Sequence, residues 1–228
     1  MSFKYKLAEI LLRWIRILRS KQDVSSYDRY KQIEAITERL ESEKEWLSKL
    51  TVPPLDSDYL LIGKFIQIYA VTDLSARRVV DAMKSIALGP DKCNASTLND
   101  KDVLDHIENM TADWAWDEKV KDAVVRALMT LKMHRTHRHK FAHWVVRRFV
   151  YDDVLVALTM NAKQARNNQA PHQPGRATFG IFHTADIMSE MVKLQAHSDN
   201  LSKVAVHLET NASRLRGVSR TTASRSTT

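Results

Sequence analysis

The residues best suited to acid–base chemistry lie in one window of the sequence, between positions 131 and 150. This window contains four of the nine histidines and no carboxylate. Histidine has a reference pKa of about 6.5, so it can exchange a proton near neutral pH. Arginine can hold a phosphate through two parallel hydrogen bonds. The lysines and arginines of the window are Lys132, Arg135, Arg138, Lys140, Arg147 and Arg148.

Three interpretations of this window are open on the residues alone. The simplest is the solvated end of a helix, where cations interact favourably with the helix dipole and its free carbonyl groups. A metal site is the second, because His139 and His143 share one helical face and His134 or His137 could add a ligand. No Cys, Asp or Glu lies nearby and the surroundings are positively charged, so we expect neither a bound metal nor another cofactor.

The third interpretation is acid–base cleavage of a phosphodiester. An imidazole would transfer the proton, and an arginine would hold the phosphate and stabilise its developing charge. Cleavage of RNA needs only these two roles, because the 2′-hydroxyl group of the substrate is the nucleophile. RNA is therefore the anionic partner that this window favours.

The segment Arg138-His139-Lys140-Phe141-Ala142-His143 resembles the arginine–polar–x–x–x–histidine signature of the HEPN superfamily. The resemblance covers roughly residues 57–212 and implies an all-helical bundle. Many members are metal-independent endoribonucleases, often of toxin–antitoxin or defence type, that pair two protomers around one cleft. By this resemblance Arg138 would bind the scissile phosphate, His143 would be the general acid or base, and His139 would orient them.

The resemblance also implies partners for the chain. We expect RNA, a second copy of the chain in a homodimer and, for a toxin, a neutralising protein. The RNA-binding residues would be the remaining cations of the window: Lys132, Arg135, Lys140, Arg147 and Arg148. Because some members of the superfamily have lost activity, the alternative is a noncatalytic helical protein that binds RNA or another partner.

The spacing of the signature sets a geometric condition. Five steps of 100° place Arg138 and His143 about 140° apart around an ideal helix. They act on one phosphate only if the helix bends between them or if a partner protomer supplies one of the two.

The elements that carry these residues are predicted to be mainly helices. Glycine and proline together supply only ten residues, and most lie in three clusters, so long stretches have no helix breaker. Two runs rich in β-branched residues around Tyr151-Asp152-Asp153 predict a small β-hairpin near 144–158, with a continuing helix as the alternative. The segment 161–180 is predicted to be a loop. Helices are expected at Phe3–Leu18, 27–50, 57–88, 100–110, 116–139 and 184–216, as a bundle of long antiparallel helices.

The last of these helices carries a heptad repeat of apolar residues, which predicts lengthwise packing. The repeat supports a homodimer, unless residues 27–50 cover the same stripe within one chain. The repeat consists of Ile187, Leu194, Leu201, Leu208 and Leu215.

The helix that begins near residue 57 is expected to be capped at its N-terminus by Asp56 or Ser57.

The charge of the chain lies mostly at its ends. Of the net charge of +8, residues 1–21 hold six basic residues against one acid, and residues 212–228 hold four arginines and no acid. We expect an N-terminal arm over 1–52, a HEPN-like domain over 53–216 and a disordered basic tail over 217–228. The basic amphipathic helix of the arm favours docking on protein over a membrane surface. The single Cys93 and the absence of a signal-peptide pattern indicate a cytoplasmic protein.

Overall fold

A computed structural model describes residues 26–43, 45–89, 94–113, 118–168, 170 and 175–223 of the chain. In this part the predicted mainly helical class is confirmed, since seven α-helices accompany one small antiparallel sheet. No helix among these residues is long and apolar enough to cross a membrane. The predicted helix Phe3–Leu18 and residues 224–228 lie outside the described part.

The chain forms two compact units. Unit 1 contains the described residues up to Tyr59 together with Trp144–Ile187, and unit 2 contains Leu60–His143 and the chain from Met188 onward. These limits differ from the expected division after residue 52. The reason is that Thr51–Val52 pairs with a strand nearly one hundred residues later, which ties the N-terminal arm to the sheet.

Unit 1 is built on a four-stranded antiparallel sheet with the order β1-β2-β3-β4. The predicted hairpin is present as β2 (Val145–Phe149) and β3 (Val154–Thr159), with Val146 opposite Ala157. The sheet also contains β1 (Thr51–Val52) and β4 (Thr178–His183), which the sequence did not predict. Strand β4 and the short helix α7 (Ala162–Asn167) both fall wholly or partly within the predicted loop 161–180.

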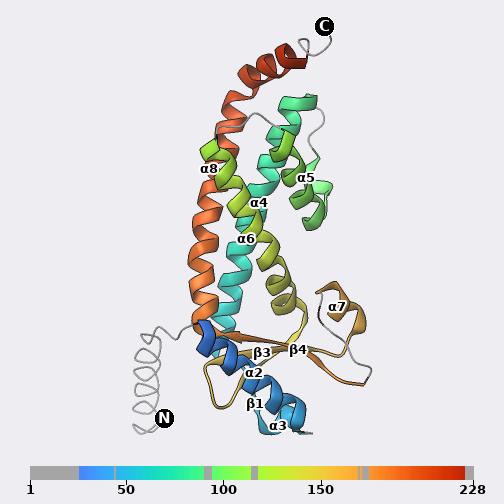
Figure 1. Ribbon diagram of the computed structural model, residues 1–228, viewed down its shortest axis with the longest axis vertical. Helices are drawn as coiled ribbons and strands as arrows, with labels where there is room; N and C mark the ends of the chain where they lie inside the picture. The colour runs from blue at the N-terminus through green and yellow to red at the C-terminus, as the bar shows by residue number, and fades with distance from the viewer. Residues whose placement is uncertain are drawn as a thin grey trace. The chain divides into compact units, whose positions relative to one another are not determined.

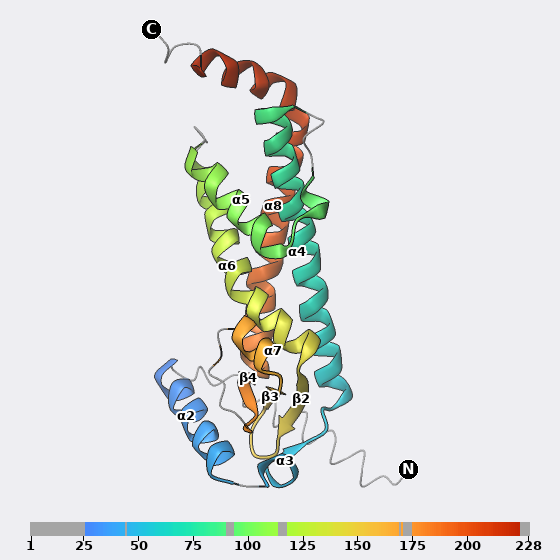
Figure 2. The same ribbon diagram turned by 90° about the vertical axis from the view of Figure 1, so that its right-hand side faces the viewer.

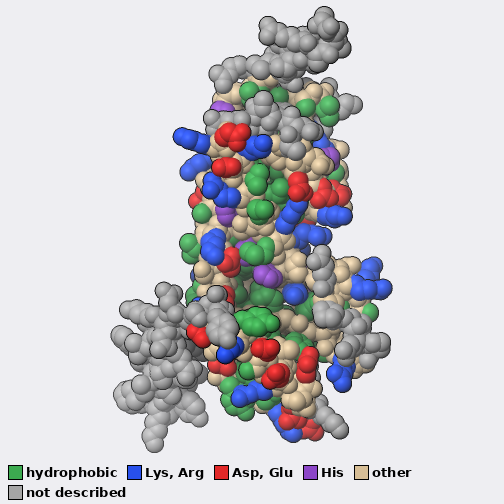
Figure 3. Space-filling view, in the orientation of Figure 1, with side chains coloured by type: hydrophobic (Ala, Val, Ile, Leu, Met, Phe, Trp, Pro, Cys, Tyr) green, Lys and Arg blue, Asp and Glu red, His purple; other side chains and the backbone are tan. Residues whose placement is uncertain are grey.

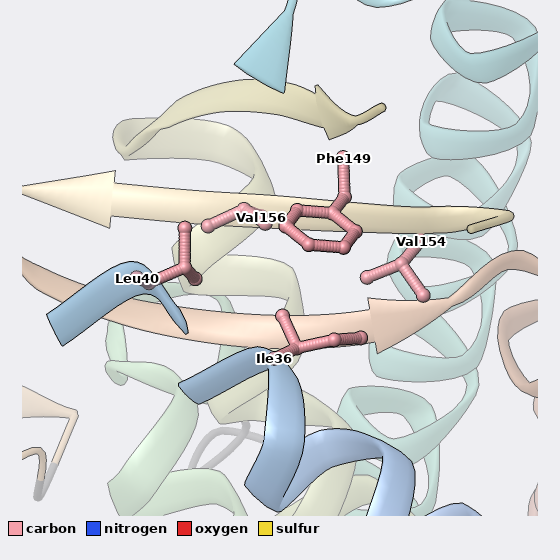
Figure 4. Close-up of a cluster of buried hydrophobic side chains, with 5 residues drawn as sticks. All are labelled: Ile36, Leu40, Phe149, Val154 and Val156. Atoms are coloured by element: carbon pink, nitrogen blue, oxygen red, sulfur yellow. The ribbon is translucent and has the colours of Figure 1, made fainter. Parts of the chain in front are cut away.

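One face of this sheet is covered by helix α2 (Ser26–Ser42). Figure 4 shows the side chains of this helix against those of the two central strands. The predicted helix 27–50 is in fact divided into α2 and α3 (Trp46–Lys49). The division follows Glu43, whose carboxylate accepts the backbone N–H of Glu45 at 3.2 Å, an alternative to the helical bond. The buried cluster consists of Ile36, Leu40, Phe149, Val154 and Val156.

Unit 2 is made of long helices. Helices α4 (Asp56–Leu88), α6 (Glu118–His143) and α8 (Thr184–Ala223) lie side by side in both views, with α6 running opposite to the other two (Figure 1, Figure 2). Helix α5 (Asp100–Asp113) packs beside α6, and a 3₁₀ turn, η2 (Ala95–Thr97), precedes it. Helix α8 continues to Ala223, so the first part of the predicted disordered tail is helical here. No Gly or Pro follows Gly217 to end the helix.

The heptad repeat of α8 packs within the chain. Leu194, Leu201 and Leu208 are buried, and ion pairs from α4 and α6 reach the same helix. The repeat therefore gives no independent argument for a dimer.

The N-terminus of α4 is held by a residue that the sequence did not single out. The carboxylate of Asp58 accepts the N–H of Leu55 at 2.8 Å, which is the third-residue half of a capping box. The expected cap from Asp56 or Ser57 was therefore wrong. Both of those side chains are exposed, whereas Asp58 is buried.

Candidate active site at the end of helix α6

The signature segment occupies the last turns of α6, and packing against α4 fixes the rotation of this helix end. The rings of Phe141 and Phe65 meet edge to face at 5.6 Å, and His134 contacts the same Phe65 ring at 5.5 Å. The helix is continuous to His143. No break in α6 therefore brings Arg138 toward His143. The two side chains can act on one phosphate only if a partner protomer supplies one of them.

His139 and His143 form a pair of imidazoles one helical turn apart. Their ring centroids are 4.5 Å apart and the rings are inclined by 52°. The Nε2 atom of His139 is buried and has no hydrogen-bond partner among the described residues, whereas His143 is exposed. Burial lowers the pKa of His139, and the neighbouring His143, Arg138 and Arg135 lower it further. His139 is therefore neutral at pH 7 and can accept a proton.

Two arginines flank this pair. Arg135 is exposed and Arg138 is half-buried, and neither forms a hydrogen bond or an ion pair within the described part of the chain. Burial raises the pKa of Asp73 on α4, and the charge of Arg138 acts in the opposite direction together with Arg77. Arg138 thus faces the polar side of α4, and both arginines keep their hydrogen-bond donors for an anion.

Helical spacing divides these four residues into one group and one outlier. Arg135, His139 and His143 follow each other at steps of four, so they lie within about 80° of the helix circumference. On an ideal helix Arg138 lies about 60° from Arg135, on the side away from the imidazoles. Burial raises the pKa of Tyr69 on α4, and the charges of both arginines act to lower it. In a single chain this spacing groups Arg135 with the two imidazoles and places Arg138 beside that group.

The other two histidines of the window are less accessible: His134 is buried and His137 is half-buried. His134 is fully buried, its Nε2 lies 3.1 Å from a carboxylate oxygen of Glu190, and burial lowers its pKa. Burial also lowers the pKa of His137 to about 4, with a further contribution from the neighbouring His134 and Lys140. Neither ring belongs to the His139–His143 pair. Among the described residues, no group of three or more His, Cys, Asp or Glu is arranged to hold a metal ion.

Two lysines predicted to bind RNA have other surroundings. Lys132 forms an ion pair with Glu108 of α5. Lys140 is half-buried, and burial lowers its pKa. Figure 3 shows Lys and Arg interspersed with Asp and Glu over helices α6 and α8, so this face carries mixed charge.

The arginines of strand β2 belong to unit 1. Arg147 donates to the hydroxyl and the carbonyl of Thr51, both at 3.3 Å. Arg148 is buried and bonds the carboxylates of Asp58, at 2.5 Å, and Asp153. The prediction that Arg148 contacts RNA is therefore corrected, because its buried guanidinium group is occupied by two carboxylates, of which that of Asp58 is also buried.

A polar row on α4 was not predicted. Tyr69, Asp73 and Arg77 follow each other at steps of four, and Arg77 bonds Asp73, Asp100 and the carbonyls of Ala95 and Leu98 at 2.7 to 3.0 Å. The spacing was visible in the sequence, but the partners on the following loop were not. No protein-family model, curated protein or solved structure matches the chain.

Proposed function

We propose that this chain is a HEPN-like protein that acts on RNA, as a metal-independent endoribonuclease of the toxin or defence type. The observation that carries the proposal is the end of α6, where two arginines without ion pairs flank a pair of imidazoles. One imidazole is kept neutral by its surroundings and the other is exposed. These are the groups that phosphodiester cleavage by a 2′-hydroxyl requires.

The proposed roles follow from the chemistry of each side chain. A histidine accepts the proton of the 2′-hydroxyl as that oxygen attacks phosphorus, and a histidine donates a proton to the departing 5′-oxygen. Arg138 holds the phosphate and stabilises the charge that develops on its oxygens. His143 is the proposed proton carrier, and His139 orients it. The products would be a 2′,3′-cyclic phosphate and a free 5′-hydroxyl group.

The separation of Arg138 from His143 enters the proposal directly. On a continuous helix the two side chains point about 140° apart, so one chain does not direct both at the same phosphate. The proposal therefore includes a homodimer, in which Arg138 of one protomer works with His143 of its partner, within the helical bundle of the superfamily. A neutralising protein and a cytoplasmic location belong to the same proposal.

The second candidate is a noncatalytic protein that binds RNA or another partner. The mixed charge along α6 and α8 and the exposed apolar residues of the long helices favour this candidate. The two functions predict different consequences for His143, since binding through charge does not need its imidazole.

Incubation of the purified full chain with total RNA tests the proposal. Wild type should cleave RNA and leave cyclic phosphate ends, and Arg138→Ala and His143→Ala should each lose at least about a hundredfold in rate. The matched control is His207→Ala, which removes an exposed imidazole of α8 outside the signature. Absence of cleavage by wild type, or equal loss in His207→Ala, would contradict the proposed nuclease.

A further inference from the structure

Helix α4 has two apolar faces, and only one of them is covered by the residues that the structure describes. Its inner face includes the completely buried Ala76, Val79, Val80 and Met83. Its other face is a row at steps of three and four, which we name the α4 stripe. Leu60 and Leu74 are each 59% exposed and Val71 is 42% exposed. The α4 stripe consists of Leu60, Gly63, Gln67, Val71 and Leu74, all exposed.

Gly63 is the least expected member of this row. A glycine inside a helix costs about 0.5–1 kcal/mol relative to alanine. A Cβ atom at this position would meet no heavy atom of the described residues within 4 Å, so packing among them does not require the glycine. A glycine exposed on an apolar helical face allows the backbone of a second helix to approach closely.

We infer that the α4 stripe is a homodimer surface, on which α4 packs antiparallel against α4 of a second copy around a two-fold axis at Gln67. The sequence of the stripe is nearly symmetric about that residue. Leu60 lies seven positions before Gln67 and Leu74 seven after it, so Leu60 of one copy lies opposite Leu74 of the partner subunit. Gly63 and Val71 lie four positions to either side, so Val71 of the partner subunit would fill the space left by Gly63. This pairing is isologous, as a closed dimer requires.

The charges on the same face select the antiparallel direction. Asp56 and Arg78 lie eleven positions before and after Gln67, which places both on the face of the stripe. The antiparallel pairing brings each Asp56 opposite Arg78 of the partner subunit, whereas a parallel pairing would place like charges together. Arg78 also donates to both carboxylate oxygens of Glu209 of its own chain, at 3.1 and 2.7 Å, and its remaining N–H groups are left for a second carboxylate. Lys64 is the one charged residue between these ends on this face, and in the antiparallel pairing it would lie opposite the small Ala70 of the partner subunit.

The proposed function also includes a homodimer, but the surface inferred here is argued only from the exposed face of α4 and would stand if the protein cleaved no RNA. The alternative occupant is the apolar face of residues 3–18 of the same chain, which would leave the protein monomeric. A second copy is favoured because the stripe is self-complementary in both size and charge.

The mass of the full chain in solution tests the inference. Light scattering at micromolar concentration should give twice the 26.2 kDa of one chain. Leu74→Glu should raise the dissociation constant at least about a hundredfold, because a carboxylate in each copy would lose water without a partner. Val192→Glu changes a still more exposed apolar residue, on α8, and should leave the dimer intact. A monomeric wild type, or an unchanged constant for Leu74→Glu, would overturn the inference.

Gly63→Ala separates the dimer from the fold. The added methyl group should make the isolated chain more stable, because alanine is the better helix former. The same methyl group should weaken the dimer about tenfold or more, because it occupies the space that Val71 of the partner subunit fills. A variant that is more stable and dimerises as well as wild type would contradict the close approach at Gly63.

Disulfide cross-linking tests the register in a Cys93→Ser background. Gln67→Cys places two thiols at the two-fold axis, so mild oxidation should link the protomers. Leu60→Cys and Leu74→Cys should each fail to cross-link, because each residue lies about 21 Å along the helix from its counterpart in the partner. Cross-linking by Leu60→Cys, or none by Gln67→Cys, would overturn the antiparallel arrangement.

Discussion

Replacing Arg148 by methionine should destabilise unit 1 by about 3 kcal/mol, since it leaves a buried carboxylate without its counter-ion. The guanidinium group bonds Asp58 and Asp153, and these two carboxylates differ in their surroundings. The Asp58 side chain is 4% exposed and cannot recover water, whereas that of Asp153 is 44% exposed and can. The loss therefore arises mainly at Asp58.

The magnitude follows from what Asp58 retains. Removing one partner of a buried ion pair costs about 3–5 kcal/mol. Asp58 still accepts the N–H of Leu55 at 2.8 Å, which stabilises its charge and favours the lower end of that range. Asp58→Asn keeps an acceptor for this N–H and removes the charge. The double variant Arg148→Met with Asp58→Asn should therefore recover to within about 1 kcal/mol of wild type.

Urea unfolding followed by circular dichroism measures this change, and hydrogen exchange of the β2 and β3 amides assigns it to unit 1. Arg147→Met is the matched control. Its two bonds to Thr51 are 3.3 Å long, so its loss should stay below about 1.5 kcal/mol. Equal effects of the two substitutions, or a loss below about 1 kcal/mol for Arg148→Met, would refute the reasoning.

Three further predictions concern pH, metal and the tail. The pKa of His137 is lowered to about 4, so the unfolded chain binds more protons than the folded chain between about pH 6.5 and 4. The free energy of unfolding should therefore fall by up to about 3 kcal/mol as the pH falls through this window, and His137→Gln should reduce that fall. An equal fall in the variant would show that His137 does not cause it. Cleavage of RNA should be unchanged by excess EDTA, and loss of activity reversed by added metal would contradict metal independence. Deleting residues 217–228 removes two arginines and should lower the salt slope of RNA affinity by about 1.4 if both contact phosphates, whereas an unchanged slope would exclude the tail.

The long helices of unit 2 could be predicted because they depend on local features. Clusters of Gly and Pro separate them, and apolar spacing marks their inner faces. Strand β1 could not be predicted, because two residues carry no recognisable period. Strand β4 was missed because Gly180 interrupts a short apolar run beside a polar segment. Its pairing with β3 is a long-range contact that local sequence does not encode.

The candidate site could likewise be predicted only where it depends on local spacing. The His139–His143 pair follows from a spacing of four on one helix, and the structure places the rings together. The partners of His134 and Arg148 come from other elements, so local sequence patterns do not indicate them. Arg148 could still have been questioned, because adjacent residues of a strand point to opposite faces. Once a hairpin was predicted, either Arg147 or Arg148 had to point inward.

The separation of catalysis from binding in His143→Ala tests the central claim most directly. The cleavage rate and the RNA affinity of this variant would be measured beside those of wild type under single-turnover conditions. The proposal predicts a rate lower by at least about a hundredfold, because positioned acid–base catalysis is worth about 10² to 10⁴. It also predicts an affinity within a few fold, because the cations that bind phosphate remain, and an unchanged helical content. Equal cleavage by both proteins, or loss of fold in the variant, would contradict a catalytic role for His143.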